Sequence, residues 1–270
     1  MALDRTRLLK PVEKLQKRIK KADRELTPSS VHDLRTNVRR FEAIFKALSL
    51  ERHGVRRSTL RDLDRLDKRA GKVRDMDVLV RYASTVHPKG QEDSAVQLLE
   101  HLSNQRRKQA RKLYAEECRL RRPLGKDLKH AASIMMKVAD SAHGKVNAAE
   151  SQVRLKAELG ASRRLGKHNL HAFRLKVKEL RNVLEIERPP TRSKLAEALG
   201  HAKDAIGEWH DWEMLVAVAQ KTLDRNDARG LIAELKGIAK NRYREAILLA
   251  EALRRTIRAK LHHGSVAAAK

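Results

Sequence analysis

The stretch VHDLRTNVRR, residues 31–40, and the later stretch LHAFRLKVKE, residues 170–179, carry the same pattern about half a chain length apart. Each has a histidine, an arginine three residues later and a second cation seven residues later. The apolar residues around them keep the 3.6-residue spacing of an amphipathic helix. The recurrence of this pattern predicts an internal duplication in a helical protein.

On a helical wheel, the histidine and the cations of each stretch lie on one side and the apolar residues on the other. At about 100° per residue, Arg35 and Arg39 fall within about 60° of His32. Leu34 and Val38 fall on the opposite side. The second stretch repeats this arrangement, so each helix has an apolar face and a cationic stripe.

A solvated surface is the alternative explanation for one such stripe. Solvated faces usually carry carboxylates four residues from each cation, because like charges at that spacing repel. These stripes lack such neighbours and occur twice, which favours a ligand-binding role. Arginine can bind phosphate oxygens in bidentate fashion, lysine adds a point charge and histidine can donate a hydrogen bond. Such a set suits a chain of phosphates.

The composition points to the same class of partner. The 270 residues include 61 Lys and Arg against 34 Asp and Glu, a formal net charge of +27. This excess favours a polyanion: nucleic acid, an anionic membrane surface or a phosphate polymer. Aromatic residues make up only 3%, too few to expect a platform for stacking bases. Cys118 is the only cysteine, which excludes an intramolecular disulfide framework and a cysteine-based zinc site.

We predict an all-α fold of two four-helix bundles, produced by the duplication and related by a pseudo-two-fold axis, with a basic groove or pore between them. The predicted helices cover residues 5–26, 28–48, 59–85, about 91–119, 124–159, 169–187, 193–223 and 227–262. They form a single domain, 1–262, with repeat 1 at about 5–120 and repeat 2 at about 122–262, the second opening at Pro123. Residues 263–270 are predicted to be a flexible tail, and SAHGKVN near residue 144 is a predicted kink.

The sequence resembles the CHAD family, the conserved histidine α-helical domain. The resemblance rests on VHDLRTNVRRF, LDKRAGKVRDMDVL, LHAFRLKVKELR and LGHAKDAIGEWHDWEML, and it covers nearly the whole chain. It implies two four-helix bundles with a basic surface or pore between them. It also implies binding of inorganic polyphosphate, at polyphosphate granules in some members. The chain lacks the E-x-E-x-K strand of the CYTH domain to which CHAD domains are often joined, so we expect a stand-alone module.

The stripes and the resemblance together define the candidate polyphosphate-binding residues. These are His32, Arg35, Arg39, Lys46, Arg74, His171, Arg174, Lys178, Arg181 and His210. Further cations could extend the track, although a solvated face explains them equally well: Arg40, Arg107, Arg111, Lys240 and Arg244.

Asp75 and Asp211 directly follow Arg74 and His210, and neighbours in sequence do not face each other on a helix. We therefore expect each aspartate to reach a cation on an adjacent helix and to orient the arginines or histidines there. A plain structural ion pair is the alternative. Gly71 and Gly207 occupy matching positions and are predicted to allow close helix approach, and Trp209 and Trp212 are predicted to lie in the core or an interface.

Other functions fit the sequence less well. The charge permits nucleic-acid binding, but no docking motif supports it. A metal-dependent phosphohydrolase would need an acidic metal cluster or a catalytic triad, and neither pattern is present. The pairs His168 and His171, and His262 and His263, come without carboxylate or cysteine ligands. We expect a cytoplasmic, non-enzymatic protein without metal or cofactor that binds polyphosphate, and other polyanions non-specifically, and no membrane.

Overall fold

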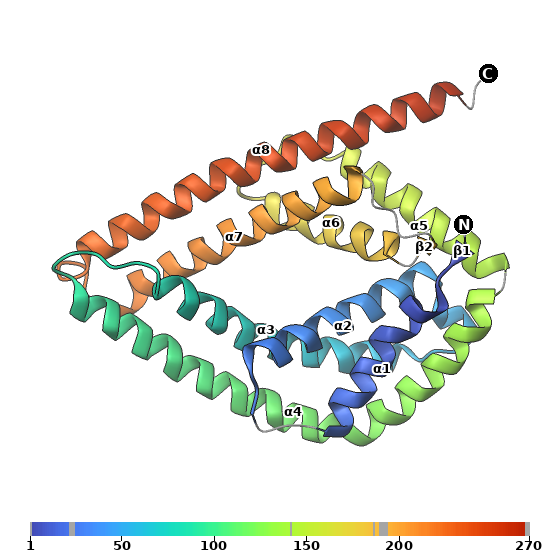
Figure 1. Cartoon of the computed structure of the whole chain (residues 1–270), viewed down its shortest axis with the longest axis horizontal. Helices are drawn as coiled ribbons and strands as arrows, with labels where there is room; N and C mark the ends of the chain where they lie inside the picture. Colours follow the sequence, from blue (N-terminus) through green and yellow to red (C-terminus); the bar gives the residue numbers. More distant parts are fainter. Residues whose placement is uncertain (1, 22–24, 141, 186, 189–193, 268–270) are drawn as a thin grey trace. The chain divides into compact units, whose positions relative to one another are not determined.

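The structure is a computed structural model that describes residues 2–21, 25–140, 142–185, 187–188 and 194–267. These residues form eight α-helices, which confirms the all-α prediction, together with one short 3₁₀ helix and a pair of two-residue strands (Figure 1). In the part of the chain that is described, no helix is long and apolar enough to span a membrane.

The chain divides into two compact units, each of which draws on both halves of the sequence. Unit 1 comprises Met1–Asp77, Ser103–Ser151 and Glu185–Pro190, and unit 2 comprises Val78–Leu102, Gln152–Leu184 and Thr191–Lys270. The predicted repeat bounds, the pseudo-two-fold axis and the groove stay predictions.

The two units contain different helices. Unit 1 holds α1 (Arg5–Lys21), α2 (Pro28–Ala47), the 3₁₀ helix η1 (Leu50–His53) and most of α3 (Arg57–Ala83). Unit 2 holds α6 (Leu170–Leu184), α7 (Lys194–Thr222) and α8 (Arg229–Ala267). Helices α4 (Glu92–Asp140) and α5 (Ala142–Gly160) contribute to both. Within the units α1 packs on α2, and α7 packs on both α6 and α8.

The predicted helix break at Pro123 is wrong. Helix α4 runs unbroken from Glu92 to Asp140 and includes Pro123, which is exposed. A proline inside a helix costs about 3 kcal/mol or more because it removes a hydrogen bond and crowds the preceding turn. Leu120 and Leu124, on either side of the proline, are buried, and each contributes about 1.5–3 kcal/mol. Tertiary packing therefore overrides the local signal.

Other helix ends agree better with the sequence. Thr27 caps α2, its side chain accepting a hydrogen bond of 3.2 Å from the backbone N–H of Ser30, and Pro28 occupies the first turn. Helix α4 ends at Asp140 and α5 begins at Ala142, close to the predicted kink. Helix α8 continues to Ala267, past its predicted end.

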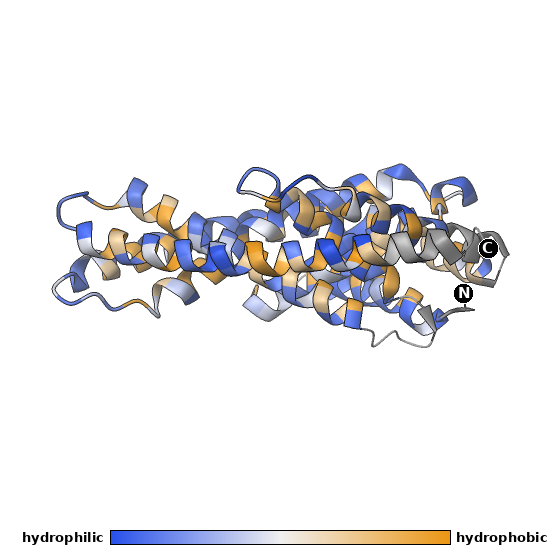
Figure 2. Ribbon diagram, turned by 90° about the horizontal axis from the view of Figure 1, so that it is seen from above, coloured by the Kyte–Doolittle hydropathy of each residue, from blue (hydrophilic) through white to orange (hydrophobic). Residues whose placement is uncertain are grey.

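The apolar faces predicted for the two histidine-bearing helices form their buried sides. Helix α2 buries Val31, Leu34, Val38, Phe41, Ile44 and Phe45. Helix α6 buries Leu170, Phe173, Val177, Leu180, Val183 and Leu184. Apolar and polar residues alternate along the helices (Figure 2). Trp209 and Trp212 of α7 are buried, as predicted.

The strand pair, like the 3₁₀ helix η1, is an element that the sequence did not predict. β1 (Ala2–Leu3) pairs antiparallel with β2 (Glu187–Arg188), both in unit 1. Two residues per strand are too few for an alternating pattern to be recognised in sequence.

Candidate functional site

In unit 1, two predicted cations of α2 share one carboxylate of α3. Arg35 donates from Nε to Oδ1 of Asp67 at 3.2 Å, and Arg39 donates from Nε and Nη2 to Oδ2 at 3.3 and 3.2 Å. The Arg35 and Asp67 side chains are 20% and 19% exposed, so the cluster is partly desolvated but open to solvent. Asp67 therefore holds both guanidinium groups side by side.

Asp75 also contributes to this cluster. Its Oδ1 lies 3.8 Å from Nη1 of Arg35, a longer contact than that of Asp67. The expectation that Asp75 reaches a cation on an adjacent helix is confirmed. The stronger partner, Asp67, was missed, although it stands eight residues before Asp75 and hence on a similar side of α3.

Gly71 lies between these two aspartates and makes room for Arg35. A Cβ at Gly71 would stand 3.4 Å from the Cζ and Nη2 atoms of Arg35. In unit 2 a Cβ at Gly207 would stand 3.0 Å from Cζ and 3.1 Å from Nε of Arg174. The predicted role of the glycines is corrected accordingly: an arginine side chain fills the space beside each glycine.

Unit 2 differs from unit 1 beside its glycine. Asp67 stands four residues before Gly71, and Lys203 stands four residues before Gly207. Arg174 donates from Nε to the backbone carbonyl of Lys203 at 3.2 Å, whereas Arg35 donates from Nε to the Asp67 carboxylate. The Lys203 side chain pairs with the exposed Asp204 at 2.5 Å. A cation thus occupies the position that carries an anion in unit 1.

Two predicted histidines meet in unit 2. The rings of His171 on α6 and His210 on α7 lie with their centroids 5.1 Å apart and tilted by 49°. The indole of Trp209 packs against Tyr243 at 5.4 Å and donates from Nε1 to Glu213 at 3.3 Å. A buried aromatic residue thus flanks the position of His210 on α7.

Other predicted cations form ion pairs or hydrogen bonds, most of them within their own helix. Arg40 pairs with Glu185 at 2.9 Å, and Lys46 pairs with Glu42 at 2.9 Å. Arg107 and Arg244 donate to asparagines three residues earlier in their helices, at 2.5 and 3.4 Å.

The remaining predicted residues differ in exposure. His32, Arg111 and Lys240 are exposed; Arg74, Lys178, Arg181 and Asp211 are half-buried. His168 is exposed, and the His262 and His263 side chains lie outside the described residues. Within the described part of the chain, no three metal-ligating side chains come together.

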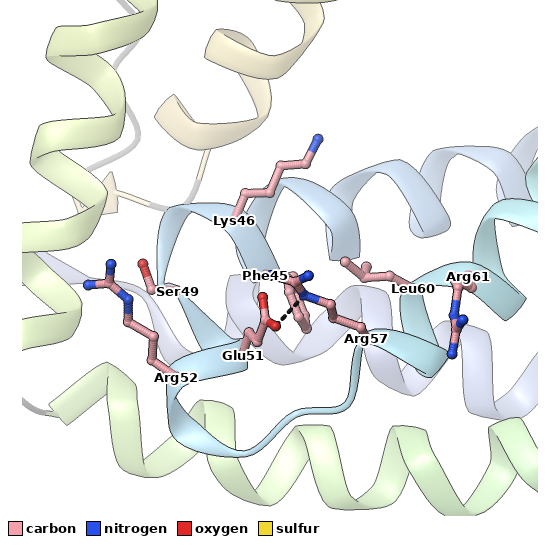
Figure 3. Close-up of a pocket in the computed structure, with 8 residues that line it drawn as sticks. All are labelled: Phe45, Lys46, Ser49, Glu51, Arg52, Arg57, Leu60 and Arg61. Carbon is pink, nitrogen blue, oxygen red and sulfur yellow. Dashed lines mark ion pairs between the residues drawn. The ribbon is translucent and has the colours of Figure 1, made fainter.

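A pocket that the sequence did not predict lies where the chain turns from α2 through η1 into α3 (Figure 3). We call it the turn pocket; its volume is about 740 Å³. It is lined by Phe45, Lys46, Ser49, Glu51, Arg52, Arg57, Leu60 and Arg61. Of these residues only Lys46 was a predicted site residue. Four others lie between the predicted helices 28–48 and 59–85: Ser49, Glu51, Arg52 and Arg57.

A smaller hollow of about 380 Å³ lies between α3 and α4. It is lined by Arg65, Lys68, Arg69, Lys72, Glu116 and Arg119. The Arg119 guanidinium lowers the pKa of Glu116, and the charges of Arg69 and Arg65 add to this effect. The α3 cations of this hollow stand three and four residues apart: Arg65, Lys68, Arg69 and Lys72. This spacing could have revealed a second cationic stripe in the sequence.

Comparison with known families identifies the family of this chain. A model of the CHAD domain matches residues 6–220, which include His32, Arg35, His171, Arg174 and both glycines. The chain belongs to the CHAD domain family. This CHAD domain is similar to the crystal structure of the CHAD domain from the plant Ricinus communis, with a TM-score of 0.66 and 18% identity. The match covers 96% of this chain and 94% of that chain, and at this identity the likeness shows the fold alone. No curated protein matches the chain.

Proposed function

We propose that this CHAD domain binds inorganic polyphosphate without hydrolysing it. The observation that carries the proposal is the placement of Arg35 beside Gly71 in unit 1 and of Arg174 beside Gly207 in unit 2. Each arginine comes from the helix that carries the histidine pattern, and each glycine comes from a later helix of the same unit. Two matching cationic positions suit a ligand with a repeating anionic unit.

The chemistry of the side chains supports a phosphate ligand. A guanidinium presents donors in a planar fork that matches two phosphate oxygens, and charge-assisted hydrogen bonds of this kind are among the stronger ones. Arg35 and Arg39 are already brought together by Asp67, so less conformational entropy is lost when they bind.

The two units differ in the group that accepts from the arginine Nε atom and that a phosphate would have to displace. A phosphate group at Arg35 and Arg39 competes with the Asp67 carboxylate for the same donors. In unit 2 the Nε atom of Arg174 donates to the main-chain oxygen of Lys203 instead. A phosphate group would compete with this carbonyl for the Nε donor of Arg174.

The roles of the nearby carboxylates support binding without cleavage. Hydrolysis of a phosphoanhydride normally requires a metal ion or a positioned base. Asp67 and Asp75 instead form ion pairs with the arginines that would bind the phosphates. We propose a polyphosphate-binding role in the cytoplasm, at polyphosphate granules where the cell forms them.

A paired substitution tests the assigned positions. Arg35→Ala combined with Arg174→Ala should weaken binding of long-chain polyphosphate at least about tenfold, because two charge-assisted contacts are lost. Arg225→Ala combined with Arg229→Ala is the matched control, since both are exposed arginines and the charge change is identical. Binding is measured by titration at one fixed salt concentration. Equal losses in the two variants would contradict the assigned site.

A further inference from the structure

The turn pocket combines cations from three elements of unit 1. Lys46 comes from the last turn of α2, Arg52 from η1, and Arg57 and Arg61 from the start of α3 (Figure 3). Ser49 has a positive φ of 49°, a left-handed conformation that reverses the chain at the end of α2. This reversal brings residues of η1 and α3 beside Lys46.

The charges that line the pocket are not balanced. The lining contains four cations and one carboxylate, that of Glu51, which forms an ion pair with Arg57. Lys46 pairs with Glu42. Among the residues that the structure describes, no carboxylate forms an ion pair with Arg52 or Arg61, and both side chains are exposed. The pocket therefore has two exposed cations available to an anionic ligand.

The start of α3 adds to this positive potential. The first turn of α3 carries no acidic residue, and Arg57 and Leu60 of this turn line the pocket. The N-terminus of a helix carries a partial positive charge of about half an elementary charge. An acidic residue in the first turn would reduce it. The backbone thus acts in the same direction as the four side chains.

The pocket continues the cationic face of α2, which we define as His32, Arg35, Arg39 and Lys46. At 1.5 Å per residue this face extends for about 21 Å along the helix. Lys46 belongs both to its last turn and to the lining of the pocket. An extended anion that follows the face from His32 therefore reaches the pocket at the other end.

We propose that the turn pocket is a second subsite for polyphosphate, which binds the part of the chain that extends beyond the cationic face of α2. The inference rests on the proposed function. It adds a consequence of its own: only a chain long enough to pass Arg39 and Lys46 reaches Arg52 and Arg61. A short oligophosphate that occupies the Arg35–Arg39 end leaves the pocket empty, so the pocket favours long chains.

The test compares tripolyphosphate with long-chain polyphosphate in the full-length protein. Arg52→Ala combined with Arg61→Ala removes two charges that take part in no described ion pair, so a normal thermal melting curve is expected. This variant should raise the Kd for the long chain about tenfold and leave the Kd for tripolyphosphate within about twofold. The slope of log K against log salt for the long chain should fall in magnitude by about 1.4, at about 0.7 per phosphate contact as in single-stranded nucleic acids.

The control variant is again Arg225→Ala with Arg229→Ala, which removes the same charge from unit 2. A similar loss for both chain lengths, or a long-chain loss no greater than in the control, would overturn the inference while leaving the proposed function intact. Failure of the wild-type protein to bind polyphosphate of either length would overturn both.

Discussion

Arg35 and Asp67 are joined by a 3.2 Å hydrogen bond from Nε to Oδ1, and the other oxygen of this carboxylate accepts from Arg39. This arrangement has two opposing effects on an incoming phosphate. Asp67 orders the guanidinium groups, and it also offsets part of their charge. Unit 2 carries Lys203 at the corresponding position before its glycine, so the charge at this position differs between the two units.

Asp67→Asn tests which effect is larger. We expect the variant to bind long-chain polyphosphate about three- to tenfold more tightly, because a repulsive charge is removed while a hydrogen-bonding side chain remains. The matched control is Asp64→Asn, whose ion pair with Lys68 is exposed on the same helix. Titration of both variants at equal salt gives the comparison. Weaker binding by Asp67→Asn would mean that orienting the arginines matters more than the competing charge.

Gly207→Ala tests the placement of Arg174. A methyl group at this position would overlap the guanidinium, so Arg174 must move, and we expect weaker polyphosphate binding by a folded protein. Gly200→Ala is the matched control on the same helix, because a Cβ there has no neighbour within 4 Å. The control should gain about 0.5–1 kcal/mol of stability from helix propensity and bind normally. Unchanged binding by Gly207→Ala would contradict the role of Arg174.

A buried ion pair joins α1 and α4 within unit 1. Arg18 donates to both carboxylate oxygens of Glu117 at 3.0 Å, and the Glu117 side chain is fully buried. Arg18→Met should lower the free energy of unfolding by about 3–5 kcal/mol, because it removes the bidentate contact of Arg18 with a buried carboxylate. Urea denaturation measures the change. The double variant Arg18→Met with Glu117→Met should recover most of the loss, and an equally unstable double variant would contradict this explanation.

The protein is not expected to hydrolyse polyphosphate. Incubation of polyphosphate with the protein and Mg²⁺ or Mn²⁺ should release no orthophosphate above the rate without protein, because the carboxylates beside the arginines are held in ion pairs. Release that a single substitution such as Asp67→Asn abolishes would contradict the binding role and indicate an enzyme.

The helical periodicity of the sequence was sufficient to predict the buried and cationic faces of α2 and α6. Residues such as Phe41 and Phe173 are placed by spacing along one helix, which sequence reveals directly. The partnership of Arg35 with Asp67 depends on the register between two helices, which no spacing within one helix contains. Pro123 was misleading because its local cost is outweighed by burial of its neighbours. The turn pocket was missed because it forms only when the chain reverses at Ser49.

Competition between polyphosphate and DNA tests the central claim most directly. The labelled complex of the protein with either polymer is titrated with the other at matched charge concentration and fixed salt. The proposed function predicts that polyphosphate displaces DNA and that DNA displaces polyphosphate only weakly. The arginine positions suit a flexible phosphate chain, and the protein has few aromatic residues on which bases could stack. DNA that displaces polyphosphate equally well or better would contradict it.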